Sequence, residues 1–139
     1  MSLQTPKGRL YVVVGVLLDG RGDVLIQQRR AGTPRAGQWE FPGGKRENGE
    51  PAKAALTREL MEELGIRVES VEPLVGIAHD YDHARVWLDT YLITAYSGIV
   101  KGREGQAIAW TPIDRVTEFD VLEAVHPILK ALRKHPEIR

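Results

Sequence analysis

Three glutamates lie on one predicted helical face within residues 44–66, and this feature most constrains what the chain can fold into. Glu59, Glu62 and Glu63 stand at positions i, i+3 and i+4, so in a helix their side chains project from neighbouring points. Carboxylates at these spacings repel one another by a few tenths of a kcal/mol per pair in water, and by more where water is scarce. A hard divalent cation reverses the sign of this interaction, because Mg²⁺ binds carboxylate oxygens and keeps positions for phosphate oxygens. The spacing therefore indicates either a metal site or a solvated acidic face.

Several local signals predict the helix itself. Pro51 suits a first helical position, Glu50 favours the positive end of the helix dipole, and Gly65 is typical just after a helix C-terminus. Apolar residues recur at three- and four-residue steps and predict a buried stripe beside the glutamates: Ala55, Leu56, Leu60 and Leu64. A solvated helix would share this pattern, since glutamate is a good helix former and charge runs usually face water.

The loop before this helix distinguishes the two interpretations. It reads Glu-Phe-Pro-Gly-Gly-Lys over residues 40–45, and paired glycines permit positive φ values and close approach of the backbone to a ligand or metal. A solvated surface helix does not need such a loop. The glycine loop and the acidic face together favour a metal site.

The spacing in this segment resembles the complete box of the Nudix hydrolases. Gly44 is followed after five residues by Glu50, and after seven more by Arg-Glu-Leu-Met-Glu-Glu-Leu-Gly-Ile at 58–66. The resemblance extends to the strand pair before the box, the loop at 40–45, a Gly-Arg-Glu-Gly-Gln stretch at 102–106 and a C-terminal helix begun by His126-Pro127. Over nearly the whole chain it is similar to the MutT branch. This resemblance implies an α+β fold, the α/β/α sandwich of the Nudix family with a mixed β-sheet.

The rest of the chain predicts a mixed order of strands and helices. Residues 9–18 and 24–30 are rich in β-branched residues and flank a polar turn at 19–23, which predicts a β-hairpin. Further strands are predicted at 70–79, 84–96 and 107–111, and a closing helix at 127–134 with Pro127 in its first turn. Without strict alternation of strand and helix, this order predicts a mixed sheet covered by helices.

Composition limits the function classes. A chain of 139 residues predicts a single domain over 1–139, and 19 basic against 19 acidic residues leave no basic field for DNA or an anionic membrane. The absence of cysteine excludes disulfides and thiol catalysis, and the four histidines show no spacing typical of zinc ligands. No run approaches the ~20 apolar residues that span a bilayer, and no leader pattern is present. We expect a cytoplasmic protein, a monomer or weak dimer, with a small-molecule nucleotide substrate and neither polymeric nucleic acid nor a membrane as partner.

The resemblance also implies a metal site and a catalytic set. Mg²⁺, with Mn²⁺ as a substitute, is expected to bind among Gly44 through its carbonyl, Glu50, Glu59, Glu62, Glu63 and Glu104. Arg58 is expected to hold a carboxylate in its coordinating geometry through its planar fork. Either Glu63 or Glu104 serves as general base, because a carboxylate beside an activated water can take its proton.

Substrate contacts are expected outside the acidic face. The candidate residues are Arg29, Phe41, Gly43, Lys45, Tyr81 and Val125. Arg29 is expected to contact phosphate and Tyr81 to stack on a nucleobase. The alternatives are an exposed arginine at a strand end and an aromatic that packs at a sheet rim. Lys45 either balances phosphate charge or is solvated.

The choice of nucleotide is the least determined part. The MutT branch carries an asparagine just before the C-terminal helix that reads the edge of an oxidised guanine, and the matching position here is Val125, which cannot form hydrogen bonds through its side chain. Loss of such a bond costs about 1–3 kcal/mol. Asp120 or His126 compensates if the register differs by one or more residues.

The resemblance implies hydrolysis of a nucleoside triphosphate such as 8-oxo-dGTP to the monophosphate and pyrophosphate. CTP or a modified dCTP, a diadenosine polyphosphate and ADP-ribose are the alternative substrates. A Nudix-fold binding domain without turnover is the alternative class, although such a domain has no need of Arg58 and the three glutamates after it.

Overall fold

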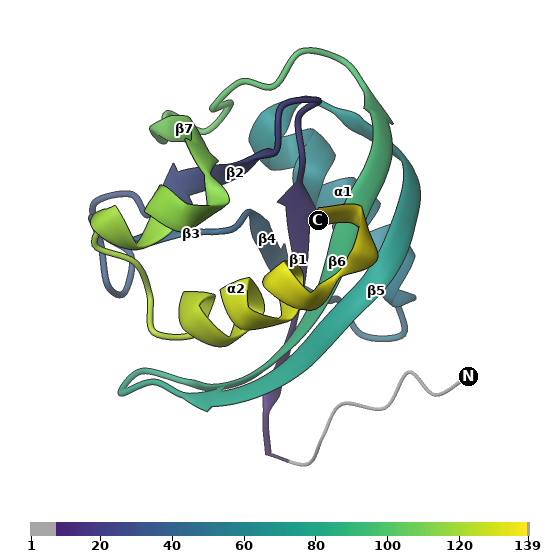
Figure 1. The fold of residues 1–139 in the computed structure, drawn as a ribbon. Helices are drawn as coiled ribbons and strands as arrows, with labels where there is room; N and C mark the ends of the chain where they lie inside the picture. Colours follow the sequence, from purple (N-terminus) through teal and green to yellow (C-terminus); the bar gives the residue numbers. More distant parts are fainter. Residues whose placement is uncertain (1–7, 139) are drawn as a thin grey trace.

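The computed structural model describes residues 8–138, and its strands divide over two sheets (Figure 1). One sheet has the strand order β4-β1-β6-β5 and the other the order β3-β2-β7. The elements are β1 (Leu10–Leu17), β2 (Asp23–Gln28), β3 (Trp39–Glu40), β4 (Gly43–Lys45), α1 (Ala52–Leu64), β5 (Arg67–Asp80), β6 (Arg85–Ser97), β7 (Ile108–Pro112), α2 (Val125–Lys134) and the 3-10 helices η1 (Ile113–Glu118) and η2 (Pro136–Ile138). In the described part of the chain, no helix has the length and apolar character needed to cross a membrane. The first residues, where the sequence predicts no leader, lie outside the described range.

The predicted mixed sheet between helices is confirmed. In the four-stranded sheet β1 runs parallel to β6, whereas the β1–β4 and β5–β6 pairs are antiparallel. Side chains alternate between the two faces of a strand. Val13 therefore packs in one cluster with Leu56 of α1, and Val14 packs in another with Leu129 of α2. The helices cover opposite faces of this sheet and form the α/β/α sandwich.

The predicted hairpin between residues 9–18 and 24–30 is wrong. The two strands meet only at an isolated antiparallel bridge between Leu18 and Val24, and then enter different sheets. The physical reason is that β1 is paired on one edge with β4 and on the other with β6, so no edge remains for β2. The turn at 19–23 therefore joins the sheets and opens a space between them.

The other predicted strands and the closing helix are confirmed with shifted ends. β5 begins three residues before the predicted 70, and α2 begins at Val125, two residues before the predicted 127. Residues 43–45 of the predicted glycine loop form β4, in which Gly43 pairs with Val14. Pro127 remains in the first turn of α2, where a missing N–H costs no helical hydrogen bond.

Helix α1 follows its sequence signals closely. Pro51 is the N-cap with extended backbone angles, and Gly65 takes a φ of 73° and donates its N–H to the Met61 carbonyl. The four apolar residues of the predicted stripe are fully buried, with no exposed area. Glu50 makes no side-chain cap, because its carboxylate is bound to Arg58 instead.

A buried hydroxyl on β6 leads to a stability prediction. Thr90 is 1% exposed and its hydroxyl has no hydrogen-bond partner among the described residues. It lies opposite Val14 of β1 and Val75 of β5. Thr90→Val keeps the side-chain shape and removes the unsatisfied group, so we expect the free energy of unfolding to rise by about 1 kcal/mol. Urea unfolding measures this value, and a decrease would contradict the prediction.

Candidate active site

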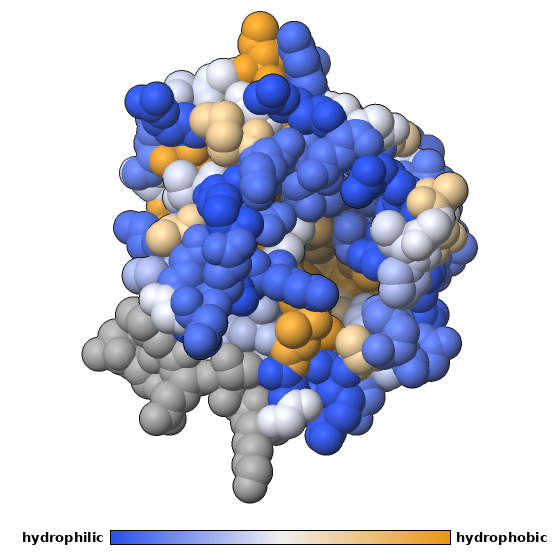
Figure 2. Space-filling view, turned by 180° about the vertical axis from the view of Figure 1, so that it is seen from behind, coloured by the Kyte–Doolittle hydropathy of each residue, from blue (hydrophilic) through white to orange (hydrophobic). Residues whose placement is uncertain are grey.

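A cleft of about 600 Å³ opens where the two sheets diverge. Seen from behind, hydrophobic surface lies in a hollow that hydrophilic residues surround (Figure 2). The apolar part of the lining contains Val12, Val14, Leu88, Val125 and Ile128, and the acidic part contains Glu40, Glu63 and Glu104. The cleft therefore offers an apolar pocket and a group of carboxylates within one space.

Glu63 is the glutamate of the box that lines the cleft. Its Oε1 accepts hydrogen bonds from the Gly43 N–H at 3.1 Å and from Gln27 Nε2 at 3.4 Å. Burial, and then the charges of Glu59, Glu40 and Glu104, together raise the pKa of Glu63 to about 8. These carboxylates thus lie close enough to repel one another.

Arg58 binds the remaining carboxylates of the box. Its Nε and Nη2 donate to the two oxygens of Glu50, both at 2.9 Å, and its Nη1 donates to Glu59 at 2.9 Å and Glu62 at 3.2 Å. Nη2 also donates to the Lys45 carbonyl at 3.1 Å. Hydrogen bonds from Arg58, and then one from the Glu47 backbone, lower the pKa of Glu50 to about 2. The planar fork of one arginine therefore fixes three acidic side chains.

The glycine pair is needed for close approach. A Cβ on Gly44 would overlap the carboxylate of Glu59, and a Cβ on Gly43 would overlap the Val13 carbonyl. Neither glycine has a positive φ, so that part of the sequence-based argument is wrong. Burial raises the pKa of Glu59, while hydrogen bonding to Arg58 opposes this rise. Gly44 thus allows a half-buried carboxylate to lie directly against β4.

The donor set suits a hard divalent cation, although no three acidic or histidine side chains of residues 8–138 converge on one cation position. The carboxylates of Glu59 and Glu63 stay apart because hydrogen bonds hold Glu59 to Arg58 and Glu63 to Gly43. The charge of Glu104 nonetheless raises the pKa of both Glu59 and Glu63, and the charge of Glu59 raises the pKa of Glu63, so these carboxylates repel one another. A cation among them would turn this repulsion into attraction. Glu62, whose side chain is 50% exposed, lies outside the cleft lining.

The two arginines at the end of β2 have different partners. Arg29, expected at phosphate, lines the cleft but donates to Glu40 at 3.0 Å and to the Pro34 carbonyl at 2.6 Å. Arg30 also lines the cleft, is 52% exposed and lies 3.9 Å from Glu104. Arg30 is therefore the arginine with more freedom to meet a phosphate.

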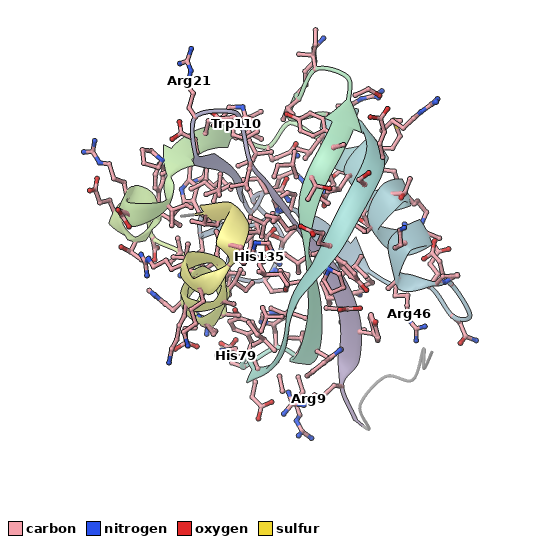
Figure 3. The ribbon with its side chains drawn as sticks, turned by 45° about the vertical axis from the view of Figure 1, so that its right-hand side comes forward. Arg9, Arg21, Arg46, His79, Trp110 and His135 are labelled. Atoms are coloured by element: carbon pink, nitrogen blue, oxygen red, sulfur yellow. The ribbon has the colours of Figure 1, made fainter. Side chains whose placement is uncertain are left out.

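Tyr81 lies on the cleft with its ring already packed. Its hydroxyl accepts the Ala124 N–H at 3.0 Å, and its ring centroid lies 4.4 Å from His79, 5.5 Å from His83 and 5.3 Å from the Arg35 guanidinium. His79 and Arg9 lie at the same end of the long β5–β6 pair, far from Arg21 (Figure 3). Tyr81 thus belongs to an aromatic cluster at the end of this strand pair, and a base can contact only the part of it that faces the cleft.

Val125, the position that the resemblance matches to the asparagine, faces the same cleft as the carboxylates. Val125 is 3% exposed on the first turn of α2 and lines the cleft. Neither Asp120 nor His126, the alternatives for this position, lines the cleft.

The sequence-predicted residues fall into two groups. The cleft lining includes Arg29, Phe41, Gly43, Gly44, Lys45, Glu63, Tyr81, Glu104 and Val125. Arg58 gathers the others beside it, namely Glu50, Glu59 and Glu62. The cleft lining also contains residues that were not expected, among them Gln27, Arg30, Glu40 and Gln106. Arg30 and Glu40 adjoin expected residues, and Gln106 ends the Gly-Arg-Glu-Gly-Gln stretch at 102–106, whereas no local signal marks Gln27.

Comparisons with known proteins agree with this architecture. The NUDIX domain family model matches residues 8–132. The chain is 37% identical over 99 residues to the 8-oxo-dGTP diphosphatase of Proteus vulgaris, a match that covers 71% of this chain and 88% of that protein. It is 31% identical over 123 residues to the CTP pyrophosphohydrolase of Escherichia coli K12, a match that covers 88% of this chain and 91% of that protein.

A solved structure has the same fold. It belongs to a study of MutT from Aliivibrio salmonicida and Vibrio cholerae, with a TM-score of 0.78, 33% identity, and coverage of 91% of this chain and 99% of that one. The sequence match, the fold and the arrangement of the box agree, and the chain therefore belongs to the Nudix hydrolase family, among its MutT-like members.

Proposed function

We propose that this protein hydrolyses a nucleoside triphosphate to the monophosphate and pyrophosphate with Mg²⁺. The observation that carries the proposal is a single cleft that joins a carboxylate cluster to an apolar pocket. Phosphoanhydride cleavage requires charge neutralisation and a positioned water, and the nucleoside requires an apolar surface. Relatives named for 8-oxo-dGTP and CTP support this class of substrate.

Nudix hydrolases in general depend on divalent metals, and we assign Mg²⁺ here, with Mn²⁺ as a substitute. The candidate ligands are the Gly44 carbonyl, Glu50, Glu59, Glu62, Glu63 and Glu104. The bound cation would neutralise charge on the phosphoryl oxygens. Glu59, Glu63 and Glu104 are favoured because they already repel one another. Arg58 positions Glu59 through its hydrogen bond.

We assign different roles in this reaction to the polar residues of the cleft. Glu63 takes a proton from the water that attacks the β-phosphorus. The bond between the β-phosphorus and the oxygen that bridges it to the α-phosphorus breaks, so the nucleoside monophosphate leaves with that oxygen and the other product is pyrophosphate. Glu63 is favoured over Glu104 as this base because two donors fix its Oε1, whereas Glu104 lies on an exposed turn. Arg30 and Lys45 balance phosphate charge, and Arg29 orients Glu40.

The nucleobase is assigned to the apolar part of the cleft beside Tyr81, Phe41 and Val125. An oxidised or otherwise modified nucleotide such as 8-oxo-dGTP is the first candidate. CTP or a modified dCTP is the second, because Val125 offers no hydrogen bond to a purine edge. The balanced charge of the chain argues against polymeric nucleic acid as a partner. We assign the protein to the cytoplasm as a monomer or weak dimer.

A substrate panel tests the proposal. Canonical, oxidised and methylated nucleoside triphosphates are incubated with the protein and Mg²⁺, and pyrophosphate release is measured. ADP-ribose and diadenosine tetraphosphate are included and read by their own products. Release of pyrophosphate from at least one triphosphate supports the proposal. Tight nucleotide binding without any turnover would favour a binding domain instead.

The substitution Val125→Asn tests the specificity assignment. An amide at this position can pair with the edge of an oxidised guanine, so we expect kcat/KM for 8-oxo-dGTP to rise about tenfold relative to CTP. The ratio of the two kcat/KM values measures the change. His126→Asn, on the exposed neighbouring position, is the matched control and should leave the ratio unchanged. An unchanged ratio in Val125→Asn would place the base elsewhere.

A further inference from the structure

Two buried glutamines connect the acidic residues of the cleft. Gln27 of β2 is 4% exposed and Gln106, just before β7, is 9% exposed. Gln106 Nε2 donates to Gln27 Oε1 at 3.1 Å, and Gln27 Nε2 donates in turn to Glu63 Oε1 at 3.4 Å. These residues lie 79 positions apart in the sequence, and the antiparallel pairing of β2 with β7 in the three-stranded sheet brings them side by side.

Backbone groups fix the orientation of the first amide. Gln106 Oε1 accepts the Glu104 N–H at 2.9 Å, and Gln106 Nε2 donates to the Glu63 carbonyl at 3.0 Å. An N–H can only donate and a carbonyl can only accept, so the Gln106 amide has one allowed orientation. Its contact with Gln27 then requires the Gln27 oxygen to face Gln106, and Gln27 must present its NH₂ to Glu63.

This order of donors distinguishes the two oxygens of Glu63. Oε1 receives the Gln27 NH₂ and the Gly43 N–H, whereas Oε2 receives no hydrogen bond from residues 8–138. Oε1 therefore already accepts its hydrogen bonds from within the protein, which leaves Oε2 to contact water or a cation. The same chain of amides also holds the turn that carries Glu104, because Gln106 Oε1 binds its backbone.

We propose that Gln27 and Gln106 form one positioning relay. The relay aims Oε2 of Glu63 into the cleft and holds the turn that carries Glu104 in place beside it. This inference rests on the proposed function and assigns both glutamines a positioning role that acts through Glu63 and Glu104. Side chains that orient a ligating carboxylate in this way affect both cation affinity and turnover, by about 10- to 100-fold.

The test uses Gln27→Met, Gln106→Met and the double variant of the full-length protein. Methionine keeps the length of the side chain and removes the amide. Mn²⁺ binding to the nucleotide-free protein is measured by titration calorimetry, and kcat and KM are measured with the substrate found by the panel. Gln38→Met is the control, because Gln38 also loses amide hydrogen bonds but lies outside the cleft lining.

We expect each single variant to raise the Mn²⁺ dissociation constant about tenfold and to lower kcat about 10- to 100-fold, with KM within twofold of the wild type. Because the relay acts as a unit, the double variant should cost no more than the worse single one. Gln27→Met, which removes the amide bound to Glu63 but not the acceptor for the Glu104 N–H, should also have no further effect on kcat in a Glu63→Gln background. Gln106→Glu, which keeps the acceptor for Glu104 and loses both donors, replaces Gln106→Met if that variant does not fold.

Additive effects in the double variant, a loss confined to KM, or values within twofold of the wild type would overturn the relay. Calorimetry separates this outcome from failure of the proposed function, since cation binding needs no substrate. If the wild type showed no hydrolysis but the variants still bound Mn²⁺ tenfold more weakly than the wild type, the relay would be supported and the proposed hydrolase function would be rejected.

Discussion

Glu63→Gln is expected to lower kcat about 10²- to 10⁴-fold, the range typical for removal of a general base. Glutamine keeps the oxygen that accepts from Gly43 and Gln27, so the fold and the amide relay remain. It removes the second carboxylate oxygen, which we assign to the water. Pyrophosphate release at saturating substrate measures the loss. Activity within tenfold of the wild type would transfer the role of base to Glu104.

The same substitution is expected to stabilise the metal-free protein at alkaline pH. The pKa of Glu63 is raised in the fold from 4.5 to about 8, so the folded state favours the protonated form. The stabilisation that this group provides is complete below pH 4.5 and is lost as the pH rises through about 8. Urea unfolding in the presence of a chelator should therefore show that the free energy of unfolding declines as the pH rises through this window. Glu63→Gln should remove this decline. Glu69→Gln, on the exposed part of β5, should leave the decline in place.

Gly44→Ala is expected to damage both the fold and the activity. The new Cβ would overlap the Glu59 carboxylate, so either Glu59 leaves Arg58 or β4 moves away from α1. Overpacking of this kind costs about 1–3 kcal/mol of unfolding free energy. Displacement of a candidate ligand should also lower kcat by at least about tenfold.

Gly20→Ala is the matched control for Gly44→Ala. Gly20 has no heavy atom within 4 Å of an added Cβ and no positive φ, so the substitution should change neither stability nor activity. Urea unfolding and pyrophosphate release measure both variants. Equal behaviour of the two would show that close approach of Glu59 to β4 is unimportant.

Local signals were sufficient for α1 and for the presence of the box. Pro51, Gly65 and the apolar stripe act within a few residues, so the sequence contains what determines this helix. The sequence could not rank Glu62 against Glu63. They are adjacent, and only the packing of α1 against β1 and β4 buries Glu63 in the cleft and leaves Glu62 half exposed.

Long-range pairing accounts for what the sequence did not predict. The hairpin prediction for β1 and β2 failed because strand propensity does not name the partner of a strand, and β1 pairs with β4 and β6. Arg29 and Arg30 could not be told apart, since the partner Glu40 belongs to another strand. Gln27 and Gln106 contact each other across 79 positions, and no periodicity encodes such a contact.

Arg58 acts as a permanent counter-ion for the acidic face of α1. Small metal-dependent domains often remain unfolded until the ion binds, because nothing else neutralises their ligands. Here Arg58 already binds Glu50, Glu59 and Glu62 and offsets part of their charge. We therefore expect the chain to fold without the cation, so that a change in the cellular level of the cation alters the rate of the reaction more than the amount of folded enzyme.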